Sequence, residues 1–393
     1  MASRILTSAA LGMATALALS GAAWAQSVQG VTKSEILVGV HTDLSGVAAS
    51  YGVGSSNAIR MRIDELNESG GIHGRKLKVI IEDTGYQVPK AVQAGNKLIK
   101  RGKVFVMVGN LGTPMNNAVL KEQMEANIPN MFPITAARQM VEPMHKLKFG
   151  ANMSYYDHIR AGVKFLVESK GKKRICAMYQ DTDFGKEVFQ GVEDQAKAMN
   201  LPLVESVSHK PTDQDFTAQI TKLKAANCDL IGAGVIIRDG IIPYATARKL
   251  GWTDVDFIGS SASFDQIVAA AQGNATEGFY TMGYFPMPYR DTAKPEVAAW
   301  WDKYKNKFGQ DPSIGAFYGY TAMDVVAIGL QKAGPNLTVD SFIKGMEQIE
   351  SYTDIFGSPP QTYGPNRRVG ADSALVMQVQ NGRFVAVSAP VRY

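Results

Sequence analysis

Residues that do chemistry in many enzymes are present, but their spacing matches no catalytic motif. Gly52 and Gly54, followed by Ser55-Ser56, suggest dinucleotide binding, yet the third glycine of that fingerprint is missing and the loop is too long for its tight turn. The sequence contains neither a phosphate loop ending in Gly-Lys-Ser/Thr nor a Gly-x-Ser-x-Gly nucleophile elbow. We therefore expect a binding protein rather than an enzyme, with no cofactor.

Side chains that could hold a metal are also scattered. The five histidines show no ligand spacing and only two cysteines occur, Cys176 and Cys228, so no metal site is expected. Each cysteine lies at or near the start of a predicted strand. The two could form a disulfide or remain as two buried free thiols, and the sequence does not decide between these alternatives. His41 follows the first predicted strand close to Asp43, where it either contacts a ligand or packs against the strand end.

Two aromatic-glycine pairs, Tyr51-Gly52 and Phe184-Gly185, occupy matching positions in the two halves of the chain. Each follows a polar loop after a predicted strand, and a helix is expected to start near each pair. Ligands of open parallel sheets bind at the carboxyl ends of the strands. Two such sheets facing each other would form a cleft walled by the two rings.

Alternating strands and helices are expected to position these pairs. Near-continuous apolar strands are typical of parallel sheets buried on both faces. The expected strands are 36–40, 76–82, 104–108, 130–132, 174–179, 203–208, 229–236 and 257–260. The expected helices are 57–69, 89–101, 114–126, 186–199, 216–226, 240–251, 297–308, 316–333 and 339–348. The pattern predicts an α/β fold of two doubly wound parallel-sheet lobes. A β-hairpin is expected at 374–379 and 383–387, around Asn381-Gly382.

The length of 393 residues suits two domains rather than one. The chain is expected to cross between the lobes three times, near residues 149, 281 and 352, which makes a multi-strand hinge. The expected division is a signal peptide at 1–25, one lobe at 26–148 plus 283–351, and the other at 149–282 plus 352–393.

The first 25 residues differ from the rest. Arg4, an apolar run at 5–22 and the cleavage site Ala23-Trp24-Ala25 predict a cleaved secretory signal peptide. No cysteine follows the apolar run, so a lipid anchor is not expected. No later stretch approaches about 18 uninterrupted apolar residues. The net charge of +5, without basic clusters among aromatics, gives no indication of a nucleic-acid partner.

A set of motifs runs through the whole predicted mature chain: LSG…YG at 44–52, DELNESGGIHGRKLKVIIED at 64–83, VGNLGTPMNNAV at 108–119, IPNMFPITA at 128–136, DTDFGKE at 181–187, ATEGFY at 275–280 and GYTAMDV at 319–325. Together they resemble the periplasmic solute-binding proteins of ABC transporters, in the branched-chain amino acid (leucine/isoleucine/valine-binding) group. The resemblance implies a type I periplasmic-binding fold, a periplasmic location, a small-molecule ligand clamped between the lobes and delivery to an ABC transporter permease in the inner membrane. A monomer is expected.

The ligand contacts of this family can be transferred position by position. The loop Asn110-Leu111-Gly112-Thr113 matches the segment that gives backbone amides and, at Thr113, a hydroxyl to a ligand carboxylate. A helix expected at Pro114 adds the partial positive charge of its first turn. The remaining matches are the next contact loop, Ile134, Thr135 and Ala136, and the aromatic wall positions Tyr51 and Phe184.

One position departs from the family pattern. Amino-acid binders of this family place an acidic residue after the strand written here DLIGAGVII, where it holds the ligand ammonium. In this chain Arg238 occupies that place and Asp239 follows, although a one-residue slip would restore an acid. An Arg238 that faces the cleft would repel an ammonium and grip a carboxylate. The alternative is that Arg238 faces solvent and Asp239 caps the next helix.

Further aromatic residues are candidates for the cavity wall, with ordinary packing as the alternative for each: Tyr155, Tyr156, Phe264 and Phe285. With Arg238 in the cleft, the pocket favours a carboxylate without an amino group. We expect an aromatic acid first and a branched 2-oxo acid next, with free branched-chain amino acids as the competitor. A receptor partner that senses ligand is the alternative role, and an exported hydrolase or oxidoreductase is a third class.

Overall fold

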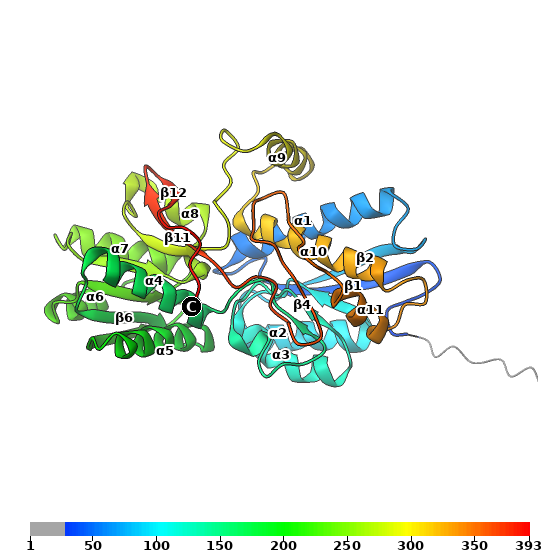
Figure 1. Cartoon of the computed structure of the whole chain (residues 1–393), viewed down its shortest axis with the longest axis horizontal. Helices are drawn as coiled ribbons and strands as arrows, with labels where there is room; N and C mark the ends of the chain where they lie inside the picture. Colours follow the sequence, from blue (N-terminus) through cyan, green and yellow to red (C-terminus); the bar gives the residue numbers. More distant parts are fainter. Residues whose placement is uncertain (1–27) are drawn as a thin grey trace, which may run out of the picture.

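The computed structural model describes residues 28–393, and the predicted signal peptide with its cleavage site lies outside them. Figure 1 shows two lobes side by side, each a sheet flanked by helices. The chain forms most of the first lobe and then passes to the second. It returns to the first lobe, where it forms the helices drawn in orange, and it ends in the second lobe (Figure 1). The two sheets order their strands β2-β1-β3-β4-β5 and β12-β11-β10-β9-β8-β6-β7. This is the expected α/β architecture of two lobes with parallel sheets.

The first lobe contains an all-parallel sheet of five strands. The strands are β1 (Glu35–Thr42), β2 (Lys76–Asp83), β3 (Val106–Val108), β4 (Asn130–Met131) and β5 (Lys148–Phe149). Its helices are α1 (Ala49–Glu68), α2 (Val88–Asn96), α3 (Thr113–Glu125), α10 (Ile314–Lys332) and α11 (Val339–Met346). Helix α9 (Pro295–Phe308) packs beside them through Trp300, whose ring lies 5.5 Å from that of Phe317 on α10.

The second lobe has a sheet of seven strands, of which β11 pairs antiparallel with both its neighbours. The strands are β6 (Ile175–Gln180), β7 (Leu203–His209), β8 (Leu230–Gly234), β9 (Asp256–Gly259), β10 (Tyr280–Gly283), β11 (Leu375–Gln380) and β12 (Arg383–Ala386). The helices are α4 (Tyr155–Lys170), α5 (Asp183–Ala198), α6 (Thr217–Ala225), α7 (Arg238–Lys249) and α8 (Gln266–Ala269). The expected hairpin is confirmed, with Asn381 and Gly382 at φ 53° and 73° in its turn.

Helix α1 begins at Ala49 and includes Tyr51 and Gly52, so a helix does start near this pair, but earlier than the expected helix at 57–69. The glycine is needed there, since a Cβ on Gly52 would lie 1.8 Å from the carbonyl oxygen of Asp43 at the end of β1. The second lobe repeats the arrangement: a Cβ on Gly185 would lie 2.0 Å from the carbonyl oxygen of Gln180. Each glycine lets its helix approach the preceding strand end, which brings the neighbouring aromatic ring to the edge of the sheet.

The third passage between the lobes lies later than the expected position near 352. Residues 352–369 stay with the first lobe, because the ring of Tyr363 packs against Phe132 and Phe149 at 5.6 and 5.7 Å. The chain then passes Gly150, with which Val369 forms a parallel bridge, and enters β11. Two of the connecting segments are therefore hydrogen-bonded to each other, with 2.8 Å between the amide of Gly150 and the carbonyl oxygen of Arg368.

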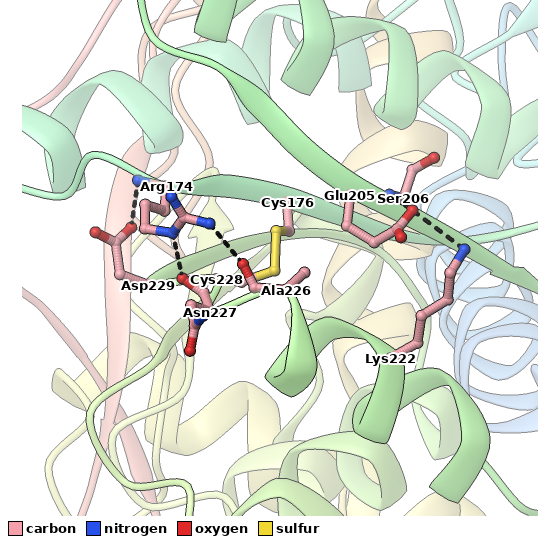
Figure 2. Close-up of a disulfide and its surroundings, with 9 residues drawn as sticks. All are labelled: Arg174, Cys176, Glu205, Ser206, Lys222, Ala226, Asn227, Cys228 and Asp229. Carbon is pink, nitrogen blue, oxygen red and sulfur yellow. Dashed lines mark hydrogen bonds and ion pairs between the residues drawn. A yellow bond between two sulfur atoms is a disulfide. The ribbon is translucent and has the colours of Figure 1, made fainter.

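A disulfide joins Cys176 on β6 to Cys228, which precedes β8 in the second lobe (Figure 2). The Cα atoms are 5.8 Å apart and both residues are buried. Close by, Asp229 accepts hydrogen bonds from the backbone amides of Lys173 and Arg174, and the Arg174 guanidinium binds the carbonyl oxygens of Ala226 and Asn227. The disulfide thus closes a loop of 52 residues near the starts of β6 and β8, where polar contacts already hold the two segments together.

Replacing both cysteines by alanine should destabilise the second lobe. In the chain-entropy model, opening a loop of this length removes about 4 kcal/mol. We expect urea unfolding of the double variant to shift to a lower midpoint while the far-ultraviolet circular dichroism spectrum is retained. An unchanged midpoint, with the disulfide verified in the parent protein, would contradict the assignment of a stabilising bridge.

Candidate functional site

A cavity of about 250 Å³ lies between the two lobes. Its wall is strongly aromatic and draws on both lobes and on the connections between them. The aromatic lining residues are Tyr51, Tyr86, Phe132, Tyr155, Phe184, Tyr284, Phe285 and Tyr318. Several of these rings pack against one another. The ring of Tyr155 packs edge-on against that of Phe184, with 4.9 Å between the ring centroids, and Tyr318 stacks on Tyr51 with 6.5 Å between theirs. A wall of this kind suits an apolar, flat ligand body.

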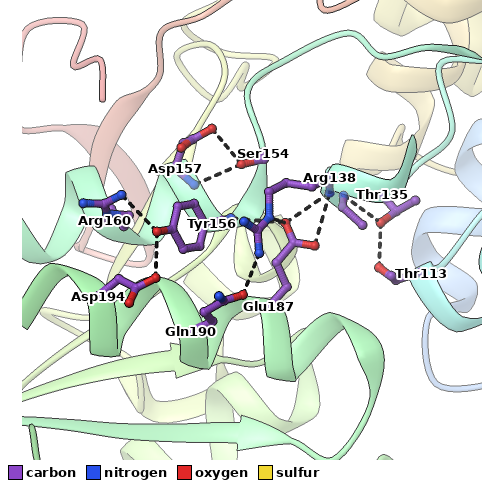
Figure 3. Close-up of polar contacts among 11 residues, drawn as sticks. Thr113, Thr135, Arg138, Ser154, Tyr156, Asp157, Arg160, Glu187, Gln190 and Asp194 are labelled. Atoms are coloured by element: carbon purple, nitrogen blue, oxygen red, sulfur yellow. Dashed lines mark hydrogen bonds and ion pairs between the residues drawn. The ribbon is translucent and has the colours of Figure 1, made fainter. Parts of the chain in front are cut away.

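One end of the cavity is polar and belongs to the first lobe. The hydroxyls of Thr113 and Thr135 are hydrogen-bonded at 2.7 Å (Figure 3). Thr113 is the first residue of α3, so its own amide and that of Met115 have no acceptor inside the helix. Pro114 between them has no N–H. Two hydroxyls beside the unpaired amides of a helix N-terminus are groups that can bind a negatively charged oxygen.

The phenol of Tyr155 lies at the same end. Burial raises the pKa of Tyr155 to about 12, although hydrogen bonds from the Ala136 amide and the Thr135 hydroxyl act in the opposite direction. The phenol is therefore neutral at physiological pH and keeps a proton that it can donate. Its backbone amide donates to the carbonyl oxygen of Ala136 at 2.8 Å, which fixes the start of α4 against the loop of the first lobe.

Direct hydrogen bonds across the cleft hold the lobes together. Tyr51 Oη donates to the carbonyl oxygen of Ala262 at 3.0 Å, and Ser50 Oγ donates to Asp265 Oδ2 at 3.0 Å. Asn117 Nδ2 on α3 donates to Asp183 Oδ2 at the start of α5, at 2.8 Å. Burial and, next, the nearby Asp265 carboxylate raise the pKa of Tyr51 well above its usual value, so its phenol remains a donor. The two lobes are thus in direct contact across the cleft.

Charge is distributed unevenly around the cavity. Among the described residues that line it, none is a lysine, arginine or histidine, and the charged ones are Glu142, Asp157, Asp354 and Asp372. These carboxylates are exposed or already engaged: Asp354 accepts from Thr321 and Ser358, and Asp157 from Ser154. Any anion held here must therefore be bound by neutral donors.

Most of the residues predicted for the site line the cavity. They are Tyr51, Leu111, Gly112, Thr113, Ile134, Thr135, Ala136, Phe184 and Phe285, together with the wall candidate Tyr155. Asn110 lies just behind them. Its side-chain oxygen accepts from the His41 amide at 3.0 Å, and its carbonyl oxygen accepts from Asn116 Nδ2 at 3.0 Å, so it holds the end of β1 and the start of α3 together.

Four other predicted residues do not reach the cavity. His41 is fully buried, and burial lowers its pKa to about 4. Phe264 packs between Phe285 and Phe384, and Tyr156 turns outward to donate to Asp194 at 2.8 Å (Figure 3). Arg238 is the fourth.

Arg238 donates to the carbonyl oxygen of Pro211 and is absent from the cavity wall, which corrects the prediction that it grips the ligand. The reason lies in its neighbour. Asp239 is buried and accepts from Gln180 Nε2, His209 Nε2 and the Ile236 amide, at 2.8, 2.8 and 3.0 Å. Asp239 thereby fixes the start of α7 with Arg238 turned away, and Ile236 faces the cavity instead.

Sequence reasoning missed Tyr86, Tyr284, Tyr318 and Ser261 as lining residues. Tyr284 directly follows β10, so the rule that sites lie at strand ends could have found it. Ser261 donates to Tyr284 Oη at 3.0 Å and lies 3.3 Å from His158 Nδ1, where burial lowers the pKa of the imidazole to about 3 and keeps it neutral. Tyr318 lies inside the largely buried helix α10, where the sequence pattern predicts that an aromatic residue packs in the core rather than lining a cavity.

Comparison with known proteins agrees with this geometry. The family model described as "Periplasmic binding protein" matches residues 35–383. The chain belongs to the periplasmic binding protein family. Its members are solute-binding proteins of ABC transporters rather than enzymes. None of the helices described for residues 28–393 combines the length and apolar character needed to cross a membrane.

Individual relatives differ in what they bind. A leucine-, isoleucine-, valine-, threonine- and alanine-binding protein of Pseudomonas aeruginosa is 26% identical over 74% of this chain and 76% of its own. A fatty acid ABC transporter substrate-binding protein from Thermomonospora curvata matches 93% of this chain and 94% of its own, with a TM-score of 0.80 and 23% identity. An R. palustris solute-binding protein in complex with benzoate matches 91% and 98%, with a TM-score of 0.79 and 18% identity. The two structures show the shared fold.

Replacing Arg238 by alanine should leave ligand affinity within about twofold of the parent, because the guanidinium is bound to the Pro211 carbonyl outside the cavity. Tyr51→Phe is the matched contrast: it removes one hydrogen bond between the lobes, worth about 0.5–1.5 kcal/mol, and should weaken binding several-fold. Calorimetric titration measures the affinity of both variants, with the ligand that most stabilises the folded parent protein in a thermal-shift assay. A tenfold loss in Arg238→Ala would contradict the placement of this residue.

Proposed function

We propose that this protein is the periplasmic solute-binding component of an ABC importer, and that it clamps a small carboxylate with an apolar, aromatic body. The predicted signal peptide supports export to the periplasm. The protein would act as a monomer and would deliver the bound ligand to a permease in the inner membrane. Binding requires no reaction, since a ligand that touches both lobes favours the closed form by its contacts.

The observation that carries the proposal is the pairing of a neutral oxyanion site with an aromatic wall. Thr113, Thr135 and the first amides of α3 suit the carboxylate, and the rings of Tyr51, Tyr155 and Phe184 suit the body. Charged donors are not required, because backbone amides and hydroxyls at a helix start bind anions effectively. A benzoate-like or phenylpropenoate-like acid fits this arrangement, and the benzoate complex of a protein with the same fold supports it.

A branched aliphatic amino acid or 2-oxo acid is the second candidate, because the Pseudomonas aeruginosa relative is a leucine-, isoleucine-, valine-, threonine- and alanine-binding protein. An amino acid needs a partner for its ammonium. Among the described lining residues, Asp354 and Asp157 are already hydrogen-bonded, and Glu142 and Asp372 lie exposed. The aromatic acid is therefore the better match.

A thermal-shift panel tests the ligand class directly. Benzoate, 3-phenylpropenoate, 4-methyl-2-oxopentanoate and leucine should be compared at equal concentrations. A ligand present at about 100 times its Kd should stabilise the folded protein by about 2.7 kcal/mol. We expect the aromatic acids to give the largest shifts; stabilisation by leucine alone would exclude the proposal and favour the amino-acid candidate.

Thr113→Val tests the oxyanion site, since it keeps the shape of the side chain and removes the hydroxyl. Loss of one hydrogen bond to a charged oxygen should weaken carboxylate binding by about 1.5–3 kcal/mol, which is roughly tenfold or more. Thr113→Ser keeps the hydroxyl and is the control. Equal affinity of all three proteins in a calorimetric titration would show that the carboxylate lies elsewhere.

A further inference from the structure

A buried carboxyl group joins the two lobes beside the cavity. Glu187 lies on α5 of the second lobe, and its side chain is only 4% exposed. It faces residues 135–142, part of the segment by which the first lobe connects β4 to β5. This segment leaves its own sheet and packs Ala137 and Met140 among residues of α4 and α5.

The contacts of Glu187 reach two separate backbone segments (Figure 3). Both carboxyl oxygens lie 3.1 Å from the amide nitrogen of Arg138, and Oε1 lies 3.4 Å from that of Tyr156. The Arg138 guanidinium is nearby, with 3.7 Å between Nε and Oε1. It also donates from Nη2 to Gln190 Oε1 at 2.7 Å, so the Arg138 contacts with α5 form only when the lobes meet.

These contacts place Glu187 behind three parts of the cavity wall. Ala136 and Ala137 precede Arg138, Tyr155 precedes Tyr156, and Phe184 lies one helical turn before Glu187 on α5. Glu187 touches no cavity space itself, since it is not among the lining residues. It is thus a positioning residue that holds the wall together when the clamp is closed.

We propose that Glu187 is a proton-sensitive latch: the lobes close more readily, and ligand is held more tightly, when this carboxyl group is protonated. The proposal rests on the clamp function proposed above. Closing the lobes brings residues 135–142 over the carboxyl and removes water from it. Separating them returns the carboxyl to solvent. A neutral acid still offers its carbonyl oxygen to the Arg138 amide and avoids burying a charge.

The groups that face Glu187 explain why the neutral form is favoured on closure. Burial raises the pKa of Glu187 to about 7 from its ordinary value of 4.5; the Arg138 amide and guanidinium and the Tyr156 amide oppose this rise, and the Glu142 carboxylate adds to it. On its own helix α5, Gln190 is neutral and Asp194 is bound to the Tyr156 hydroxyl, and on α4 Arg160 is bound to the same hydroxyl. Arg138 is thus the one cation that contacts the carboxyl among the described residues.

The sign of the pH effect follows from this rise. Closure takes up a proton wherever the carboxyl is ionised when open and neutral when closed, which is the range between the two pKa values. The stabilisation of the closed form is complete below the ordinary value and is lost as pH rises through about 7. Linkage then predicts about tenfold tighter binding at pH 6 than at pH 8.

Calorimetric titration with benzoate at pH 6, 7 and 8 tests the latch. We expect the parent to lose about tenfold in affinity between pH 6 and pH 8. Glu187→Gln, which imitates the neutral acid, should stay tight at all three values. Asp194→Asn is the matched control on the same helix and should keep the pH dependence. A parent and Glu187→Gln variant with the same pH profile would overturn the proposal.

A measurement without ligand separates this proposal from the ligand assignment. Small-angle X-ray scattering of the full ligand-free chain reports the balance of open and closed forms through the radius of gyration. The parent should become more compact as pH falls from 8 to 6, whereas Glu187→Gln should be compact throughout. If benzoate fails to bind but this difference is observed, the ligand proposal fails and the latch stands. An equal, pH-independent radius in both proteins would overturn the latch.

Discussion

Contact between the two lobes across a shared apolar cavity is the constraint on which the rest of the structure depends. Neither lobe alone encloses the space between Tyr51 and Phe184. Once the lobes meet, water is excluded and the polar groups at the start of α3 act in a medium of lower dielectric, where their hydrogen bonds strengthen. Each hydrogen bond between the lobes is worth only about 0.5–1.5 kcal/mol net, so closure remains reversible.

The same constraint explains the tight approach of helix and strand at the start of each lobe. Gly52 and Gly185 allow α1 and α5 to touch the ends of β1 and β6, closer than any residue with a Cβ could. Helix α10 approaches α1 equally closely, since a Cβ on Gly315 would lie 2.1 Å from the carbonyl oxygen of Tyr51. The ring of Tyr51 is thereby fixed from two sides, and a fixed wall costs less entropy when ligand binds.

Local patterns were sufficient to predict much of this molecule. The alternation of apolar strands and helices gave the class of fold, Asn381-Gly382 marked the hairpin, and the aromatic-glycine pairs indicated two opposite walls of the cavity. Arg238 could not be placed in this way. Its orientation depends on the buried hydrogen bonds of Asp239 to Gln180 and His209, which are far away in sequence.

Two other differences have the same origin. The passage between the lobes lies near residue 370 because Tyr363 packs against Phe132, just after β4, and Phe149 on β5, more than two hundred residues earlier. Tyr318 joins the cavity because α10 returns to lie against α1. Contacts of this kind are set by tertiary packing and leave no periodic signal in the segment itself.

The division of the first lobe between distant parts of the chain has a consequence for the order of folding. Helix α10, which covers α1, and Tyr363, which completes the core around Phe149, are made only after the whole run from β6 to β10. The second lobe can therefore assemble most of its sheet and close its disulfide while the earlier strands still lack their cover. Such long-range pairings slow folding, so the first lobe, although it starts the chain, is the later of the two to complete its core.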